Sequence, residues 1–295
     1  MRYFEYVEPG TLIEACQFLD RHEEAKILAG GVSLLVLLKN RLFNPSHLVN
    51  IKTVGGLNKI EWDDQEGIRI GALNRHRDIY YSPLIQKYCP ILAEAASKIA
   101  TPPIRNAGTI GGNIAHAEPS ADFPPSLIAL KATLKLVSTG GERKIPIADF
   151  FTDYYENVLN QGEVLAEIQI PSLPPRSAGT YLKLDKTTNS IAILGVATVI
   201  SLDDKGICID AGIGLGGVAS TPLKVGKVKE ILLGEKIKEN HIDRVAREAQ
   251  AVASPMTDIY ASAEYRKEMV YILTRRSIQE SLKKALQCER GEKRP

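Results

Sequence analysis

The sequence contains little cysteine, and no two cysteines stand close together. Its four cysteines lie at positions 16, 89, 208 and 288 of 295 residues. Zinc and iron–sulfur sites that one chain builds usually draw on CxxC pairs, so we expect no such site here. Scattered cysteines in a chain of this length are typical of a reducing compartment rather than of a disulfide framework.

Long hydrophobic runs and an excess of one charge are also missing. The longest apolar stretches, GVSLLVLL and SIAILGVATVI, are too short to span a bilayer, and the N-terminal segment lacks the apolar core of a signal peptide. The net charge of +2 gives no electrostatic basis for binding nucleic acid or an anionic membrane. We therefore expect a cytoplasmic protein that neither spans a membrane nor binds nucleic acid.

Familiar catalytic motifs are absent as well. There is no HExxH, GxSxG or Walker A sequence, and "HAE" at 116–118 lacks the PCxxC that would complete a deaminase motif. The sequence therefore predicts no catalytic side chains and no metal ligands of its own. Any chemistry would belong to a bound cofactor.

Hydrophobic periodicity predicts a mixed fold of helices and strands, with two domains or one large one. Three prolines between Pro171 and Pro175 make residues 171–180 the best candidate for a linker. After it, three apolar runs and two helices indicate an α+β domain. Expected helices cover 11–24, 33–42, 82–100 with a break near Pro90, 125–132, 241–253 and 262–287. Expected strands cover 26–29, 47–51, 67–73, 133–138, 164–171, 180–184, 190–202 and 206–215.

Two segments with paired glycines are candidate sites for phosphate groups. In ILAGGVSLL, residues 27–35, a strand runs into two glycines and a helix follows, which would expose backbone amides at a helix N-terminus. In residues 106–125, which read as neither helix nor strand, Gly111 and Gly112 could bring amides against an anion. Ordinary turns remain the alternative for both segments. A third segment, GIGLGG at 212–217, matches GxGxxG, but Pro222 prevents the required helix, so we interpret it as a strand end and loop.

These two segments together resemble the FAD-binding subunit of molybdenum hydroxylases, the medium chain of carbon monoxide dehydrogenases and its counterpart in xanthine dehydrogenases. The resemblance extends through VLAEIQIP, GIGLGGVASTPLK and ASAEYRKEMVYILTRR. It implies an α+β fold: a two-lobed FAD-binding domain of the PCMH or vanillyl-alcohol oxidase type at 1–173, with lobes at about 1–56 and 57–173. A small C-terminal domain of a short antiparallel sheet and helices would follow at 178–286, with a tail at 287–295.

The resemblance also implies which residues contact FAD. Two segments would wrap the pyrophosphate, and Asp122 would be a polar contact. Lys183 would lie near the flavin ring, where its charge would favour a reduced anionic flavin; an exposed strand lysine is the alternative. The implied contacts are Leu28, Ala29, Gly30, Gly31, Val32, Ser33, Leu34, Leu35, Ile99, Thr109, Ile110, Gly111, Gly112, Asn113, Ser120, Asp122, Leu165 and Lys183.

The function that the resemblance implies is electron transfer. A partner subunit with a molybdopterin cofactor would oxidise substrate, and a small subunit with 2Fe-2S clusters would pass electrons to FAD and on to NAD or a quinone. A heterotrimer, or a dimer of heterotrimers, would follow. Two other functions remain open: a stand-alone FAD-dependent oxidoreductase with its own small substrate, and a binding module that has lost FAD.

Overall fold

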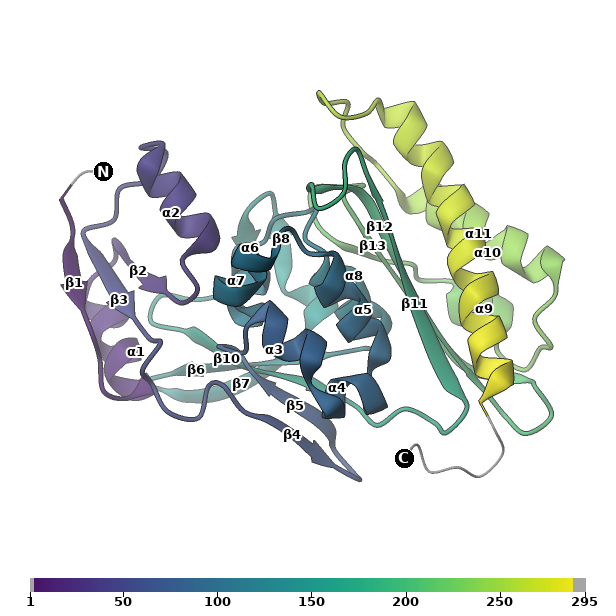
Figure 1. Ribbon diagram of the computed structural model, residues 1–295, viewed down its shortest axis with the longest axis horizontal. Coiled ribbons are helices and arrows are strands. Elements are labelled where there is room, and N and C mark those ends of the chain that lie inside the picture. Colours follow the sequence, from purple (N-terminus) through teal and green to yellow (C-terminus); the bar gives the residue numbers. More distant parts are fainter. Residues whose placement is uncertain (1–2, 289–295) are drawn as a thin grey trace.

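The computed structural model describes residues 3–288 and contains three units that follow one another along the chain (Figure 1). The first is a small three-stranded parallel sheet in the order β1-β3-β2, with α1 and α2 connecting its strands. The expected C-terminal tail beyond residue 288 lies outside the described residues. The elements of the first unit are β1 (Glu5–Val7), α1 (Leu12–Arg21), β2 (Ala25–Leu28), α2 (Val32–Lys39) and β3 (His47–Asn50).

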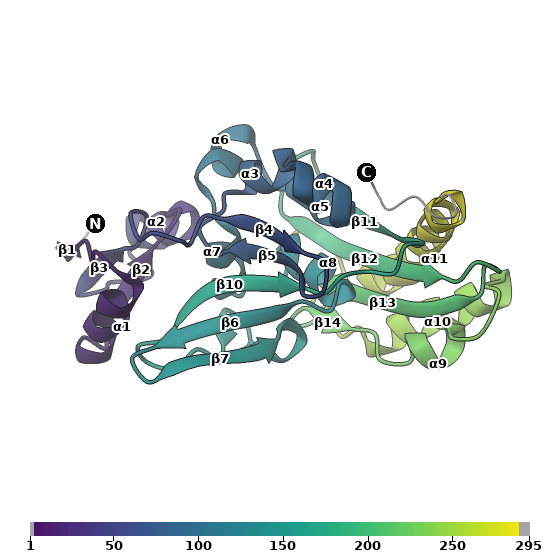
Figure 2. The same cartoon turned by 90° about the horizontal axis from the view of Figure 1, so that it is seen from below.

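The second unit is a five-stranded antiparallel sheet with a group of short helices. Its strand order is β4-β5-β10-β6-β7, and β8 and β9 form a separate two-stranded ribbon. Figure 2 shows the helices on one side of this sheet. The strands are β4 (Ile60–Asp63), β5 (Gly67–Gly71), β6 (Thr133–Ser138), β7 (Gly141–Pro146), β8 (Phe151–Asp153), β9 (Glu156–Asn157) and β10 (Val164–Ile170). The helices are α3 (His76–Tyr81), α4 (Pro83–Tyr88), α5 (Pro90–Lys98), α6 (Pro102–Ala107), α7 (Ile110–Ala115), α8 (Phe123–Ala129) and the short η1 (Ile147–Asp149).

The third unit is a four-stranded antiparallel sheet in the order β11-β12-β13-β14, followed by helices. All eleven residues of β12 are buried, because α8 packs on one face of the sheet and α11, drawn in yellow, on the other (Figure 1). The elements are β11 (Ser177–Asp185), β12 (Ala192–Leu202), β13 (Cys208–Gly216), β14 (Leu223–Lys224), α9 (Val228–Leu232), α10 (Glu239–Val252) and α11 (Ala263–Gln287).

The mixed fold is confirmed, with a two-part N-terminal region followed by an antiparallel sheet and helices. The GIGLGG segment is a strand end, as expected: a Cβ added to Gly214 would lie 2.1 Å from the carbonyl oxygen of Pro125, so α8 lies directly on the backbone of β13. No helix within residues 3–288 is long and apolar enough to cross a membrane.

Two expectations about the backbone were wrong. The linker is shorter than predicted, because β11 already begins at Ser177 and Thr180 is fully buried within it. Residues 106–125 are largely helical, since they contain the end of α6, all of α7 and the start of α8. Glycine disfavours isolated helices, but contacts with other parts of the fold hold α7, which contains two glycines, in place.

Candidate functional site

The two glycine segments meet through their backbones. A Cβ added to Gly30 would lie 2.3 Å from the carbonyl oxygen of Ala107 and 2.9 Å from the Cα of Gly108. No side chain fits in that space, because backbone atoms cannot rotate away. Gly30 therefore brings the start of α2 against the junction between α6 and α7, which joins the first unit to the second.

The start of α2 presents free backbone amides. Gly31, its N-cap residue, has a φ of 80°, a left-handed conformation that glycine adopts without strain. No side chain caps this helix, and the amides of Val32, Ser33 and Leu34 have no acceptor among residues 3–288. Unpaired amides at a helix N-terminus attract an anion. This part of the predicted phosphate site is therefore available for a ligand.

The start of α7 differs from the expectation. The amide of Ile110 donates to the carbonyl oxygen of Asn74 (2.9 Å), and the amide of Gly111 donates to that of Ala72 (2.9 Å). The amide of Gly112 donates to the Thr109 hydroxyl (3.2 Å). The expectation that Gly111 and Gly112 offer free amides was wrong, because the loop after β5 and the N-cap side chain already use them.

Side chains rather than amides are available on α7. The side chain of Asn113 leaves Oδ1 buried and without a partner in the described part of the chain. A buried polar atom that lacks a partner is costly unless a ligand or water supplies one. Asn113 thus remains suited to a bound polar group. Its neighbour Gly112 lies near the segment that leads into α2, since a Cβ on Gly112 would lie 4.0 Å from that of Ala29.

Asp122 and Lys183 lie together in a buried ion pair. The Lys183 Nζ lies 3.1 Å from the Asp122 Oδ2, with side-chain exposures of 4% and 9%. The Tyr181 hydroxyl donates to the Asp122 Oδ1 (2.7 Å). Burial raises the pKa of the Asp122 carboxyl, and the nearby Lys183 charge opposes that rise. Asp122 precedes α8, whereas both of its partners belong to β11, so this contact crosses from the second unit to the third.

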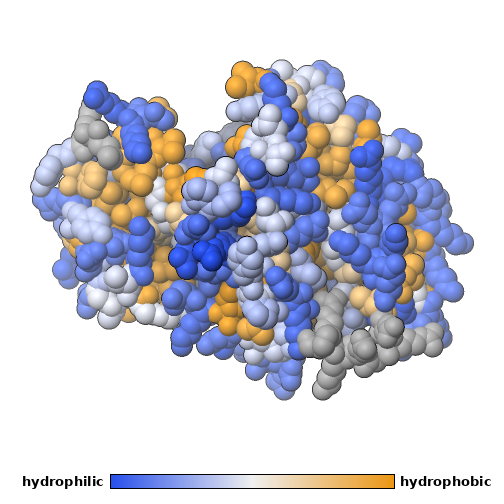
Figure 3. Space-filling model, in the orientation of Figure 1, coloured by the Kyte–Doolittle hydropathy of each residue, from blue (hydrophilic) through white to orange (hydrophobic). Residues whose placement is uncertain are grey.

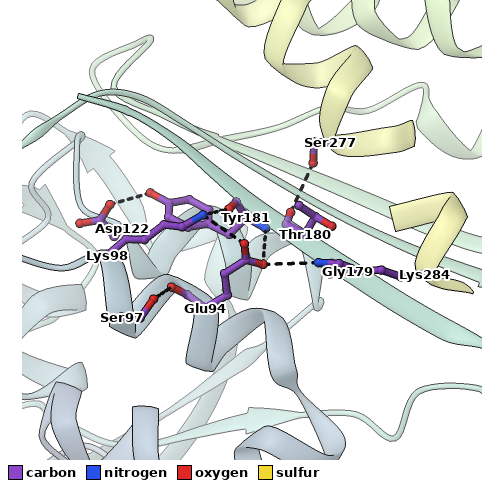
Figure 4. A network of polar contacts seen from close by, with 9 residues as sticks. All are labelled: Glu94, Ser97, Lys98, Asp122, Gly179, Thr180, Tyr181, Ser277 and Lys284. Carbon is purple, nitrogen blue, oxygen red and sulfur yellow. Dashed lines mark hydrogen bonds and ion pairs between the residues drawn. The ribbon is translucent and has the colours of Figure 1, made fainter. Parts of the chain in front are cut away.

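Charged side chains of α5 cover the outer edge of β11 (Figure 4). The Glu94 Oε2 accepts from the amide of Tyr181 (3.2 Å), and the Glu94 Oε1 lies 3.1 Å from the Lys98 Nζ. Lys98 also donates to the carbonyl oxygen of Tyr181, and its own carbonyl oxygen accepts from Lys183 (3.0 Å). The backbone that carries Tyr181 and Lys183 is thereby fixed to α5.

The remaining predicted residues lie around these two groups. Ile99, at the end of α5, is buried, and its carbonyl oxygen accepts from Arg105 of α6 (2.8 Å). Leu165 is buried in β10, next to Ala166, whose carbonyl oxygen accepts from the amide of Ala72 (2.8 Å). Ser120 is half-buried and faces the third unit, where a Cβ on Gly217 would lie 3.2 Å from its hydroxyl.

The residue that the sequence analysis missed is Tyr181. In a strand, side chains two residues apart share a face, so Lys183 could have indicated that Tyr181 lies beside it. The carbonyl oxygens of Ala72 and Asn74 were also missed, and backbone acceptors leave no signal in a sequence. Among residues 3–288, no cluster of three or more His, Cys, Asp or Glu side chains is arranged to hold a metal ion.

Comparison with known protein families identifies the class of this protein: it contains the FAD-binding domain of molybdopterin dehydrogenases. Residues 2–173 match the model of the FAD binding domain in molybdopterin dehydrogenase. Residues 179–281 match the model of the CO dehydrogenase flavoprotein C-terminal domain. The chain belongs to the family of FAD-binding subunits of molybdenum hydroxylases, as the sequence resemblance indicated, and it is an oxidoreductase subunit.

Individual relatives agree over nearly the whole chain. It is 36% identical to the 6-hydroxypseudooxynicotine dehydrogenase complex subunit alpha of Paenarthrobacter nicotinovorans, covering 96% of this chain and 95% of that one. It is 34% identical to the carbon monoxide dehydrogenase medium chain of Hydrogenophaga pseudoflava, covering 93% and 96%. A structure of carbon monoxide dehydrogenase from H. pseudoflava superposes with a TM-score of 0.92 at 34% identity, covering 96% of this chain and 98% of that one.

The site fits FAD on structural grounds. The pyrophosphate of FAD is an anion, and α2 offers three backbone amides that have no acceptors among the described residues. The unpaired Oδ1 of Asn113 offers an acceptor for a hydroxyl group. The Lys183 ammonium donates twice to partners within residues 3–288, which leaves one proton for a ligand.

Proposed function

We propose that this chain is the electron-transfer subunit of a molybdenum-containing dehydrogenase. Electrons would reach FAD from 2Fe-2S clusters of a small partner subunit, after a molybdopterin-containing large subunit has oxidised the substrate. They would leave to NAD, a quinone or another acceptor. The observation that carries the proposal is the backbone contact of Gly30 with Ala107 and Gly108, which brings the segment before α2 against the segment before α7 and supports one cofactor site shared by the two units.

Different residues of the site would contact different parts of FAD. We propose that the amides of Val32, Ser33 and Leu34 bind the pyrophosphate, because they are adjacent donors at a helix N-terminus and have no acceptor among residues 3–288. The neighbouring residues 28–31 and 35, Thr109 to Asn113, Ser120, Ile99 and Leu165 would shape the surrounding surface. When bound, FAD supplies redox chemistry through one- and two-electron steps.

Asp122 and Lys183 would act at the polar end of the flavin. Each Asp122 oxygen accepts one hydrogen bond from the part of the chain that the structure describes and keeps a lone pair for a ligand donor. The Lys183 ammonium places a positive charge in a buried setting, where charge acts strongly. That charge would favour the reduced flavin and raise its potential.

Partner subunits are part of this proposal. Helix α2 is apolar apart from Ser33 and Lys39, yet only its Leu38 is buried. Leu35, Val36 and the nearby Leu42 are 38%, 54% and 73% exposed. Figure 3 shows hydrophobic surface over this first unit, at the left. Exposed apolar patches commonly mark contacts between proteins, which supports a heterotrimer or a dimer of heterotrimers.

We also propose the domain division and the compartment. Residues 1–173 would form the FAD-binding domain, with lobes meeting near residue 56, and residues 178–286 the C-terminal domain. The sheets support this division, because none of those formed within residues 3–288 draws strands from two of these parts. The four cysteines are thiols rather than disulfides, which is consistent with a reducing cytoplasmic setting.

The experiment that tests the function is flavin analysis of the full chain, purified with any subunits that accompany it. We expect the absorption of an oxidised flavin, release of FAD on heating, and co-purification of iron–sulfur and molybdopterin subunits. The variant Gly30→Ala should lose FAD, because its Cβ would collide with the backbone of Ala107 and separate the two segments.

The matched control is Gly55→Ala, where an added Cβ would meet nothing within 4 Å. It should retain FAD at the level of the unmodified protein. A protein that contains no flavin and takes none up from solution, alone or with its subunits, would refute the proposed function. Retention of FAD by Gly30→Ala would refute the placement of the site.

A further inference from the structure

Tyr181 is a large side chain that is completely buried at the junction between α8 and β11. Its ring does not merely fill space, because its hydroxyl donates to the Asp122 Oδ1 at 2.7 Å. Burial and the Asp122 charge raise the pKa of the Tyr181 hydroxyl well above its usual value. The hydroxyl therefore keeps its proton and remains a donor throughout the physiological pH range.

The neighbouring strand is shaped to receive this hydroxyl. Gly195 of β12 pairs with Lys183 across the ladder, and a Cβ at Gly195 would lie 2.7 Å from the Tyr181 hydroxyl oxygen. Almost any other residue at position 195 would displace the hydroxyl. The glycine thus leaves room for the Tyr181 hydroxyl, which is the atom nearest to such a Cβ; the ring carbons Cε2 and Cζ would lie 3.2 and 3.3 Å away.

The Asp122 carboxylate is held by both of its oxygens. Tyr181 donates to Oδ1, and Lys183 donates to Oδ2 at 3.1 Å. Because Tyr181 and Lys183 stand two residues apart on β11, one strand fixes the rotation of the whole carboxylate. Removing the Tyr181 hydroxyl would leave Oδ1 buried without this partner and the carboxylate held from one side only.

We propose, building on the proposed function, that Tyr181 is a positioning residue that acts on bound FAD through Asp122. Tyr181 fixes the Asp122 carboxylate so that the free lone pairs of Asp122 face the cofactor in one orientation. The hydrogen bond from Tyr181 also partly neutralises the negative charge of Asp122. Tyr181 and Lys183 together make the C-terminal unit a determinant of how strongly the N-terminal units hold FAD and of the flavin potential.

The test is a double-mutant cycle on the full chain in the assembly in which it purifies, with FAD as the probe. Tyr181→Phe should raise the Kd for FAD about tenfold, equivalent to about 1.4 kcal/mol, because a carboxylate held from one side only is less well oriented toward the cofactor. It should also lower the flavin midpoint potential, because the Asp122 charge is then less neutralised. In the Asp122→Ala background, Tyr181→Phe should change neither quantity further.

The matched control is Tyr271→Phe. The Tyr271 hydroxyl donates to the Asp243 Oδ1 at 2.5 Å, between α11 and α10 and away from the glycine segments. The same chemical change there should leave the Kd and the potential unaltered. Should Asp122→Ala fail to fold, Gly195→Ala takes its place: it should weaken FAD binding when Tyr181 is present and have a smaller effect in the Tyr181→Phe background, where only ring carbons remain near the added Cβ.

The outcomes separate this inference from the proposed function. If the unmodified protein does not bind FAD, the proposed function itself fails. If it binds FAD but Tyr181→Phe has no effect, or its effect adds fully to that of Asp122→Ala, Tyr181 does not act through Asp122 and only the inference is overturned. A tenfold loss that vanishes without Asp122, accompanied by the shift in potential, supports it.

Discussion

His76 is a buried polar residue beneath the loop that carries Thr109. His76 is only 4% exposed, and its Nδ1 has no hydrogen-bond partner within residues 3–288. Its amide donates to the carbonyl oxygen of Gly108 (3.0 Å), so the histidine supports the backbone of the site. Burial, with a smaller contribution from the charge of Arg105, lowers the pKa of His76 to about 4.

We expect this histidine to make the protein sensitive to acid. The folded-state pKa lies below the ordinary value of 6.5, so the stabilisation is fully present above pH 6.5 and is lost as the pH falls toward 4. The loss should approach about 3 kcal/mol, because a tenfold difference in proton affinity between the folded and unfolded states corresponds to about 1.36 kcal/mol. In His76→Leu, the free energy of unfolding, measured by denaturant titration at several pH values, should fall less steeply as the pH is lowered from 6.5 to 4.

The control for His76 is Ser126→Ala, a change at another fully buried polar residue that does not titrate. This variant should keep the slope of the unmodified protein whatever it does to the overall stability. An unchanged slope in His76→Leu would show that other groups cause the acid sensitivity. The sequence did not predict this role, because a lone histidine gives no sign of its burial.

At the scale of elements, periodic apolar segments were predicted well, whereas the glycine-containing helix α7 was not predicted. Helix α1 begins within one residue of the expected start, after the N-cap residue Thr11, whose hydroxyl accepts from the amide of Glu14 (3.2 Å). Helix α7 was missed because its glycines argue against a helix. Its first amides are held by carbonyl oxygens of the distant loop after β5, a tertiary effect that local sequence does not reveal.

Thr109 caps α7, and its removal should loosen the site. Its hydroxyl accepts from the amide of Gly112 (3.2 Å) at the start of a helix of only six residues. Thr109→Ala should lower the free energy of unfolding by about 1 kcal/mol, the usual value of an N-cap, and should weaken FAD binding. Thr109→Ser retains the hydroxyl and should restore both. If Thr109→Ser behaves like Thr109→Ala in calorimetry and FAD titration, loss of the N-cap hydrogen bond does not cause the lower stability and the weaker FAD binding.

At the scale of the whole molecule, the sequence predicted the units but not the contacts between them. The apolar runs predicted the inner strands of each sheet, but the edge strands β1, β4, β7 and β14 were not predicted, and the expected linker at 171–180 extended into β11. The apolar runs also did not indicate that Lys183 would pair with Asp122, or that α8 would lie on β13. Both depend on residues far apart in the chain, for which one sequence gives no pairing signal.

Glu94 is the residue through which this junction can be tested. Its carboxylate accepts from the buried amide of Tyr181 and pairs with Lys98, while Lys284 of α11 lies 3.8 Å away. Glu94→Ala leaves that amide without this acceptor, which costs roughly 1–3 kcal/mol. We expect a lower melting temperature and faster release of FAD, because β11 carries Lys183 and would be held less firmly.

The matched control for Glu94 is Glu248→Ala. The side chains of Glu94 and Glu248 are 30% and 31% exposed, and Glu248 also lies 3.1 Å from a lysine, Lys227. However, its partner is a solvent-exposed side chain rather than a buried amide, so the loss should stay below about 1 kcal/mol. Equal effects of the two substitutions would mean that general surface charge, and not the junction between α5 and β11, determines stability. A larger effect of Glu94→Ala on both melting and FAD release would show that the C-terminal unit helps to hold the cofactor.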